Sequence, residues 1–517
     1  MSAIVVAWLA LSEWAGIRVV DAATRQGVPL VELETVHRVR FVTDNAGWVA
    51  IADPDLLGRE VAFTVRSHGY AFPKDGFGFA VARVVPRPGA PVELAVTRTQ
   101  LAERVCRLTG EGRWRDSVLL GLRKAAADVP APGRVAGQDS IQPVVHAGRW
   151  YCFWGDTLRL EHPLGLFRMA GATVDLATVQ DPAFDLAGGL PYDCFVEPAS
   201  GFARATIPLP ERPEGVVWVN GCCSVPDGAG QPRMVAWYSR RASLEKELEQ
   251  GIAVWEEARA VLEPVRVLPE GEWRHPVGHP LEFVEEGATW LLFGSPCCNL
   301  RAPARYEALL DRAQYEAFTC EAVAADGGGA GRPDLDEGGA PRWRWQKELP
   351  PLDSKREHEW IASGVLPPEH ARFAPRDAGV KRPILDQPSQ NVTIPPARVL
   401  LHSGTVRWNE WRQRYVLIAC QLFGTSSALG EVWYAEAHHP CGPFTTALKV
   451  ATHDRMSLYN VCHHALLDRD GGRTIHFEGT YTNDFSGNPD ATPRYQYNQL
   501  LFRLDLAREE LKKAWAE

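Results

Sequence analysis

The stretch that decides the fold is Gly137-Gln138-Asp139-Ser140, which leads through a turn at residues 146–149 to Phe153-Trp154-Gly155-Asp156-Thr157. One acidic residue precedes the first strand of this hairpin, and a second follows the returning aromatic strand. Because both strand ends of an antiparallel hairpin lie at the same edge, we expect Asp139 and Asp156 to lie close together. Paired carboxylates there are the groups that acid–base hydrolysis of a sugar linkage requires. Alternatively, Asp139 caps a turn and Asp156 is a solvated strand end.

The composition of the whole chain favours many short strands over helices. Its 517 residues include 45 Gly, 39 Pro and 18 Trp but only 4 Met, which is typical of tight turns and aromatic-lined surfaces. A chain of this length holds roughly two to four domains. The formal net charge of −9 and the lack of a basic run argue against nucleic acid as a partner.

Residues 1–15 have two interpretations. An apolar run of signal-peptide length, Ser2 to Leu11, is followed by small residues, but no basic segment precedes it. The segment is therefore either a signal remnant or a first strand, and the former predicts a secreted or periplasmic protein. The run is too short to span a membrane, and no other stretch could do so. The 11 Cys show no spacing suited to zinc.

Residues 16–100 alternate short apolar strands with tight turns. Two of these turns, Gly27-Val28-Pro29-Leu30 and Thr43-Asp44-Asn45-Ala46-Gly47, resemble those of the carboxypeptidase-regulatory-like β-sandwich. In the second, the Asp side chain bonds the nearby backbone and the Gly accepts a positive φ. We expect a small β-sandwich here, with His68 on its surface, and a linker at residues 101–136.

Beyond residue 137 one pattern recurs: an apolar strand, a polar turn and an aromatic return strand. Hairpins repeated about 60 residues apart predict a β-propeller, because each blade buries its faces against its neighbours. The polar stretch 300–396 is expected to be an inserted loop or lid with a helix at Pro303–Phe318. The chain is thus predicted to be all-β, a five-bladed β-propeller over residues 137–510 preceded by a small β-sandwich. The five copies are Val145–Thr157, Ser224–Arg241, Glu282–Pro296, Val406–Gln421 and Ala465–Thr480.

The first hairpin of the predicted propeller resembles that of a known protein family. Gln138-Asp139, followed by Gly148-Arg149-Trp150-Tyr151-Cys152-Phe153-Trp154-Gly155-Asp156-Thr157, resembles the opening of five-bladed propeller glycoside hydrolases, nearest to the DUF4185-type group that includes endo-D-arabinanases. The later stretch from Gly430 to Ala437, followed by Gly442-Pro443-Phe444, is similar to a blade edge common to arabinanase-like propellers. The resemblance implies hydrolysis of a carbohydrate substrate and places both aspartates at the active site.

Further site residues are expected where the blades meet the central funnel. Glu478 occupies the place in its hairpin that Asp156 occupies in the first, which makes it the leading third carboxylate. No cofactor is required, although funnel histidines could hold a divalent cation. The alternative for each histidine is a strand-end residue with a structural role. The predicted catalytic residues are Asp139, Asp156 and Glu478, and the predicted substrate-binding residues are Gln138, Trp154, His279, Arg407, Asn460, His464 and Tyr481.

The roles within the acidic pair remain open from sequence. Burial near the propeller axis favours a protonated Asp139. The resemblance to arabinanase-like propellers implies instead that Asp139 is the base or nucleophile, with Asp156 or Glu478 as the acid. The alternative function is a propeller that binds a glycan or a protein through its funnel without catalysis.

Overall fold

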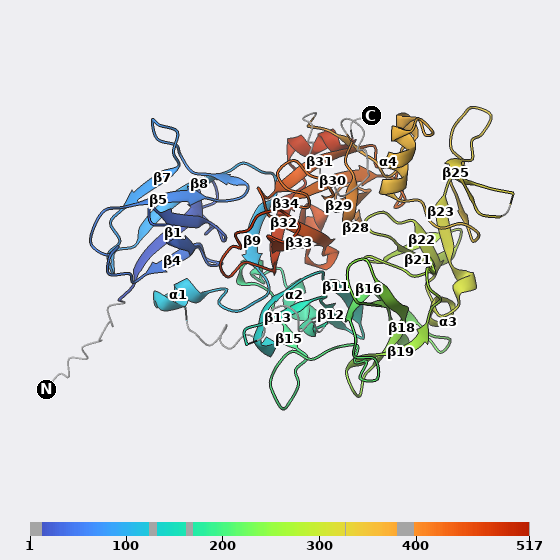
Figure 1. The fold of residues 1–517 in the computed structure, drawn as a ribbon, viewed down its shortest axis with the longest axis horizontal. Helices are drawn as coiled ribbons and strands as arrows, with labels where there is room; N and C mark the ends of the chain where they lie inside the picture. Colours follow the sequence, from blue (N-terminus) through green and yellow to red (C-terminus); the bar gives the residue numbers. More distant parts are fainter. Residues whose placement is uncertain (1–12, 124–131, 162–168, 326, 380–397, 516–517) are drawn as a thin grey trace.

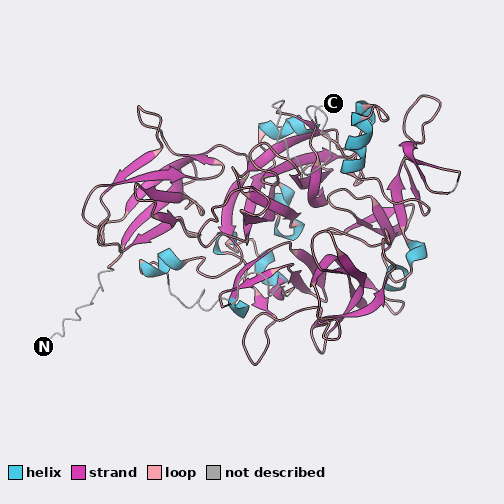
Figure 2. Cartoon of the chain, viewed as in Figure 1, coloured by secondary structure: helices cyan, strands magenta, loops and turns pink. Residues whose placement is uncertain are grey.

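The computed structural model describes residues 13–123, 132–161, 169–325, 327–379 and 398–515. In this part of the chain most regular structure is strand, and the helices are short (Figure 2). The predicted all-β class is therefore confirmed. None of these helices is both long and apolar enough to cross a membrane. Residues 1–12, which carry most of the predicted signal remnant or first strand, lie outside the described residues.

Two four-stranded sheets form the N-terminal domain, at the left of Figure 1. They share one hydrophobic core, in which Ile17 and Val49 of one sheet lie with Leu33, Phe63 and Val84 of the other, so the domain is a sandwich. In hydrogen-bonding order, the first sheet is β4 (Trp48–Ile51), β1 (Ala15–Asp21), β8 (Val92–Arg98) and β6 (Tyr70–Ala71). The second sheet is β3 (Arg40–Val42), β2 (Glu32–Thr35), β5 (Val61–Arg66) and β7 (Val81–Val84).

Five further sheets follow, which we call blades 1 to 5 in chain order. Blade 1 contains β11 (Gln142–His146), β12 (Arg149–Phe153), β14 (Gly171–Asp175) and β15 (Asp193–Cys194). Blade 2 contains β16 (Val216–Pro226), β17 (Pro232–Arg241), β18 (Glu247–Glu256) and β19 (Val261–Val267). Blade 3 contains β20 (Leu281–Glu285), β21 (Ala288–Phe293), β22 (Leu300–Pro303), β23 (Glu316–Thr319) and β26 (Arg344–Gln346).

The last two blades each include a strand from elsewhere in the chain. Blade 4 contains β28 (Leu401–Asn409), β29 (Arg414–Gln421), β30 (Glu431–Ala437), β31 (Thr446–Thr452) and the short β27 (Arg376–Asp377). Blade 5 contains β32 (Ser457–His463), β33 (Thr474–Thr482), β34 (Asn498–Asp505) and β9 (Glu103–Arg107).

Hydrophobic clusters join each blade to the next and close the sequence of blades into a ring (Figure 1). Between blades 1 and 2, the rings of Tyr151 and Trp255 meet edge to face, with centroids 5.2 Å apart. The closing cluster lies between blades 5 and 1 and includes Cys462, Leu501 and Trp150. This is the arrangement of a β-propeller, in which each blade is stable only between two others.

Blade 5 is completed by a strand from the segment that was expected to be a linker. Within residues 101–136, β9 pairs antiparallel with β34, and Leu501 lies opposite Cys106. The helix α1 (Arg115–Leu119) follows it. The linker prediction is therefore wrong, because a strand remote in sequence supplies the outer edge that the last blade lacks.

The stretch 300–396 is also more integrated than predicted. Its strands β22, β23 and β26 belong to blade 3, and the expected helix is reduced to α3 (Tyr306–Leu309). The hairpin β24 (Glu321–Val323) and β25 (Gly329–Pro333) and the helix α4 (Ser354–Ala362) are the parts outside the blades. The helix is shorter than predicted because both ends of the segment pair as strands: Pro303 lies opposite Trp290 of β21, and Glu316 and Ala317 lie opposite β22. Residues 380–397 lie outside the described residues.

The sandwich is fastened to blade 5 by one buried arginine. Arg104 on β9 is 2% exposed and donates to the carbonyls of Pro29, Leu30 and His68 at 3.0–3.2 Å. Burial and Arg104 lower the pKa of His68 to about 3, so its ring stays neutral. His68 thus belongs to the interface and not to the surface, contrary to the prediction.

Tyr481 also belongs to this interface. It is fully buried, and its hydroxyl lies 3.0 Å from Nε2 of His68 and 2.9 Å from Oγ1 of Thr492. The prediction of Tyr481 as a substrate-binding residue is therefore wrong. In β33 it points to the sandwich because side chains alternate between the two faces of a strand.

We predict that Arg104→Met will destabilise the junction between the domains. The substitution leaves three buried carbonyls without their donor, so the free energy of unfolding in a urea titration should fall by roughly 3 kcal/mol. The control is Arg503→Met on the neighbouring strand, whose ion pair with Glu103 is 40% exposed on the arginine side and should contribute less than about 1 kcal/mol. Equal effects of the two substitutions would contradict the assignment.

Candidate active site

The backbone brings Asp139 and Asp156 side by side. Asp139 follows β10 (Val135–Gln138), which pairs antiparallel with β13 (Thr157–Arg159), the strand that Asp156 precedes. Asp139 N donates to Asp156 O at 3.2 Å, and Asp156 N donates to Asp139 Oδ1 at 2.8 Å. The local hairpin therefore places the two acidic residues in direct contact.

Gly155 is what allows this contact. A Cβ atom at this position would lie 2.4 Å from Oδ1 of Asp139, closer than real Cβ contacts come. Gly155 N also donates to Asp139 O at 2.9 Å. The glycine in the turn before Asp156 is thus required by the carboxylate of Asp139.

Three aromatic side chains donate hydrogen bonds to the carboxyls. Tyr459 OH donates to Asp139 Oδ2 at 2.8 Å, and Trp218 Nε1 donates to Asp156 Oδ1 at 2.8 Å. Tyr497 OH donates to Asp156 Oδ2 at 3.3 Å. Burial and the neighbouring Asp139 raise the pKa of both tyrosines, so their hydroxyls stay protonated.

The two carboxyls differ in their electrostatic surroundings. Burial raises the pKa of Asp156, and the charge of Asp139 raises it further, to about 7. Burial also raises the pKa of Asp139, but Tyr459, Tyr497 and the backbone N–H of Asp156 oppose the rise. Asp156 is therefore the carboxyl suited to hold a proton near neutral pH, and Asp139 is the better stabilised carboxylate.

Glu478 does not join the pair, contrary to the prediction. Its side chain is fully buried, and Oε2 lies 3.1 Å from Nε2 of His464. On β33, Glu478 lies opposite Cys462, near the end of β32. Thr480 lies opposite Tyr459, near the start of β32, and accepts a hydrogen bond from Ser140 N. The third carboxylate is therefore directed into the closing cluster between blades 5 and 1.

Two other predicted substrate-binding side chains are also buried. Trp154 is 1% exposed and packs edge to face against Tyr192, with ring centroids 4.9 Å apart, so it cannot stack on a sugar. Gln138 is 3% exposed and lies in the β10–β13 ladder opposite Thr157. Both are placed by the packing of blade 1 against blade 5, which a local pattern does not reveal.

His279 and Arg407 join blades in the centre of the ring. His279 Nε2 lies 2.9 Å from the carbonyl oxygen of Ile141, so this nitrogen donates. Arg407 Nη1 donates to the carbonyls of His279 and Pro280 at 3.3 and 3.1 Å. These contacts are structural, and neither side chain contacts the aspartate pair.

Asn460, a predicted substrate-binding residue, contacts Ser140, the residue that follows Asp139. Its Nδ2 donates to Ser140 Oγ at 2.6 Å, and its Oδ1 accepts from Ser403 Oγ at 2.9 Å. Asn460 has a φ of 51° and Ser140 a φ of 54°, both in the left-handed region. The residue beside Asp139 is therefore fixed by blades 4 and 5 in a backbone conformation that non-glycine residues seldom adopt.

Sequence reasoning missed Tyr497 and Trp218. Tyr497 lies in the aromatic run Tyr495-Gln496-Tyr497-Asn498 just before the last strand, and this run is the one signal that could have found it. A Cβ atom on Gly137 would lie 2.3 Å from Tyr497 O, so this glycine permits the close approach. Trp218 comes from blade 2 and has no local signal.

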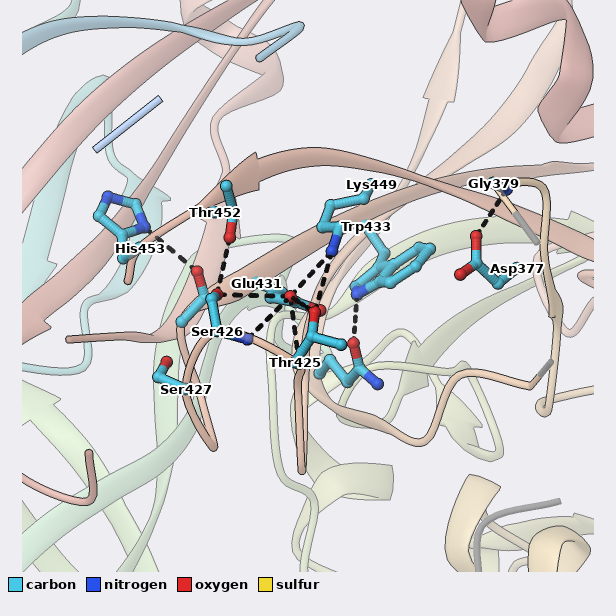
Figure 3. A network of polar contacts seen from close by, with 12 residues as sticks. Asp377, Gly379, Thr425, Ser426, Ser427, Glu431, Trp433, Lys449, Thr452 and His453 are labelled. Atoms are coloured by element: carbon cyan, nitrogen blue, oxygen red, sulfur yellow. Dashed lines mark hydrogen bonds and ion pairs between the residues drawn. The ribbon is translucent and has the colours of Figure 1, made fainter. Parts of the chain in front are cut away.

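Another buried carboxylate, that of Glu431 at the start of β30, forms a separate network (Figure 3). Its Oε1 accepts from the backbone N–H groups of Thr425 and Ser426 and pairs with Lys449 Nζ at 2.8 Å. Ser426 Oγ lies 2.8 Å from Thr452 Oγ1. These bonds fasten the loop before β30 to β31. We therefore assign Glu431 a structural role.

The predicted divalent cation has no set of ligands that can be named. Within the described residues, no three His, Cys, Asp or Glu side chains are arranged to hold a metal ion. The nitrogens of His464 face Cys462 Sγ and Glu478 Oε2, at 3.8 and 3.1 Å. A cation in the funnel therefore stays a prediction.

No family model and no curated protein matches this chain. Among solved structures, it is similar to the GH43_1 enzyme from Xanthomonas citri in complex with xylose, with 12% identity over 74% of this chain and 91% of that one and a TM-score of 0.32. A putative exo-β-1,3-galactanase from Bifidobacterium bifidum s17 shows 10% identity over 78% and 94% of the two chains, with a TM-score of 0.35. An exo-1,5-α-L-arabinanase from a bovine ruminal metagenomic library shows 11% identity over 71% and 94%, with a TM-score of 0.32.

These neighbours carry little weight for function. At such identities and TM-scores, the likeness says nothing about activity. The predicted resemblance to DUF4185-type endo-D-arabinanases and to the carboxypeptidase-regulatory-like sandwich stays a prediction.

We predict that Tyr497→Phe will raise the pKa of Asp156 by about one to two units above its value of about 7, because a hydrogen bond to the charged form is lost. Carbon NMR of protein labelled at the aspartate carboxyls measures the titration, and Asp156→Asn assigns the resonance. The control is Tyr495→Phe, whose hydroxyl donates to Thr43 O at 2.7 Å, away from the pair. An unchanged titration in Tyr497→Phe would contradict this hydrogen bond.

Proposed function

We propose that this protein hydrolyses a glycosidic bond in a poly- or oligosaccharide with the pair Asp139 and Asp156. The observation that carries the proposal is that the buried Asp139 and the half-buried Asp156 lie side by side, and that burial and the charge of Asp139 raise the pKa of Asp156 to about 7. Such a pair supplies one proton donor and one carboxylate in the same place, which is what glycoside hydrolysis requires.

The proposed mechanism assigns one role to each aspartate. Asp156 donates its proton to the glycosidic oxygen as the bond to the leaving sugar breaks, while the Asp139 carboxylate attacks the anomeric carbon. The Asp156 carboxylate then takes a proton from water, and the resulting oxygen displaces Asp139 from the anomeric carbon. The products are the two sugars, and both aspartates return to their starting states. Hydrogen bonds from Tyr459 and from Asp156 N support the ionised state of Asp139.

The spacing of the carboxyls supports a retaining reaction. Because Asp156 N donates to Asp139 Oδ1 at 2.8 Å and lies in the same residue as the Asp156 carboxyl, the nearest oxygens of the two carboxyls lie at most about 7 Å apart. Retaining enzymes separate their carboxyls by about 5–5.5 Å, whereas inverting enzymes leave about 6.5–9.5 Å for a water. Glu478 is not needed as the acid, since its buried carboxylate faces His464. The sequence resemblance to endo-D-arabinanases makes arabinan the first polysaccharide to test.

We predict that Asp139→Asn and Asp156→Asn will each lower kcat/KM on the active polysaccharide by about 10²–10⁴-fold. Asp156→Asn should lose much less on a nitrophenyl glycoside, because that leaving group needs no proton. Asp55→Asn, an exposed acidic residue of the sandwich outside the pair, is the control. Binding of a polysaccharide without turnover by the parent protein would favour the binding function instead.

We predict that the product is released with the anomeric configuration of the substrate. Proton NMR during the first minutes of hydrolysis distinguishes the anomers before they equilibrate. The closeness of the carboxyls is the physical reason, because retaining enzymes separate theirs by about 5–5.5 Å and inverting enzymes by more. Inversion would show that Asp139 acts as a base on water and not as a nucleophile.

A further inference from the structure

Next to the aspartate pair lies an exposed aromatic ring that the mechanism does not use. Phe485 is 50% exposed and lies in the segment between β33 and β34. Its ring meets that of Tyr459 edge to face, with centroids 5.8 Å apart. Since Tyr459 OH donates to Asp139 Oδ2, Phe485 is separated from the carboxylate by one side chain.

The backbone of Phe485 is strained. Its φ of 61° lies in the left-handed region, which bulky residues rarely adopt. A strained backbone and an exposed aromatic ring both disfavour the folded state, so folding does not explain the residue. Strain of this kind is found where a side chain must be presented in one direction.

The segment that carries Phe485 is held in place by its own polar groups. Ser457 Oγ donates to Asp484 O at 2.6 Å, and Thr482 Oγ1 donates to Asp484 Oδ2 at 2.7 Å. On the other side of Phe485, Ser486 Oγ donates to Asn483 O at 2.6 Å. These bonds fix both neighbours of Phe485, so the ring is pre-organised for contact.

We propose that the ring of Phe485 is a platform on which one sugar ring of the bound glycan stacks, beside the Asp139–Asp156 pair. The proposal rests on the proposed function and adds a subsite to it. The C–H face of a sugar is apolar and its edge is polar, so it suits an aromatic face surrounded by hydrogen-bonding groups. Around Phe485 these groups are Asn483, Asp484 and Ser486.

The surroundings fit a glycan better than a protein partner. Phe485 is the one large exposed hydrophobic side chain that the described residues place in the segment 483–497, whereas a protein interface requires a wider apolar patch. The same segment lines a cleft of about 1100 Å³ between the sandwich and blades 4 and 5, with Asn488, Asp490 and Thr492 on its wall. Phe485 is not among the residues that line this cleft, so the proposed subsite is confined to the ring and its polar neighbours.

The test measures binding without turnover. In an Asp139→Asn background, calorimetric titration with soluble arabinan, xylan and β-1,3-galactan should show that Phe485→Ala raises the Kd of the bound polymer about 10- to 30-fold. The control is Phe77→Ala, a loop residue of the sandwich that is 89% exposed and should leave the Kd within twofold. Unchanged binding by Phe485→Ala overturns the subsite but leaves the proposed function intact. Failure of the Asp139→Asn protein to bind any of the three polymers overturns both.

A second variant separates a binding role from a structural one. Phe485→Gly removes the ring and relieves the left-handed strain, so its Tm should be equal to or higher than that of the parent while binding is lost. A lower Tm together with lost binding would show that Phe485 acts through the fold, and would overturn the subsite.

Discussion

The pairing of β9 with β34 is the interaction on which the rest of the structure depends. It completes blade 5, and the cluster between blades 5 and 1 then closes the ring. The same strand carries Arg104, which holds the sandwich against blade 5 through three carbonyls. Because Tyr497 immediately precedes β34, this pairing also sets where its hydroxyl meets the carboxyl of Asp156. Ring closure, domain docking and the site are thus consequences of one ladder.

The site contains adjacent carboxyls and left-handed backbone conformations, which are both unfavourable for folding, and contacts from the surrounding blades stabilise them. The buried Asp139 and the half-buried Asp156 disfavour full ionisation of the pair, because burial and the charge of Asp139 raise the pKa of Asp156. Ser140, Asn460 and Tyr497 near the pair have φ of 54°, 51° and 60°, a conformation that is unfavourable for non-glycine residues. Hydrogen bonds from blades 2 and 5 hold this arrangement, through Trp218 and Tyr459. Strain and paired charge at one place are typical of a functional site.

The parts of the site that sequence predicted are local ones. Asp139 and Asp156 are 17 residues apart and lie at the two ends of one hairpin, so strand geometry alone brings them together. Predictions failed where a side chain's direction depends on another blade. Trp154 and Glu478 have the right residue types, but packing between blades 1 and 5 buries them. Tyr481 is likewise buried, by its packing against the sandwich.

The sequence by itself determined the all-β class, four of the five repeated hairpins, the N-terminal sandwich and the closeness of the two aspartates. Each of these depends on alternation of side chains and on turns, which act over a few residues. The fifth hairpin is β32–β33, so it begins at Ser457 and not at Ala465. The tertiary structure decided which strand completes blade 5, which tyrosines and tryptophan bond the carboxyls, and that Phe485 lies exposed beside them. These depend on contacts between residues that are far apart in the sequence. Arg104 contacts His68, 36 positions away, and Tyr459 contacts Asp139, 320 positions away. No local pattern encodes such contacts, because the free energy that selects them comes from closing the ring.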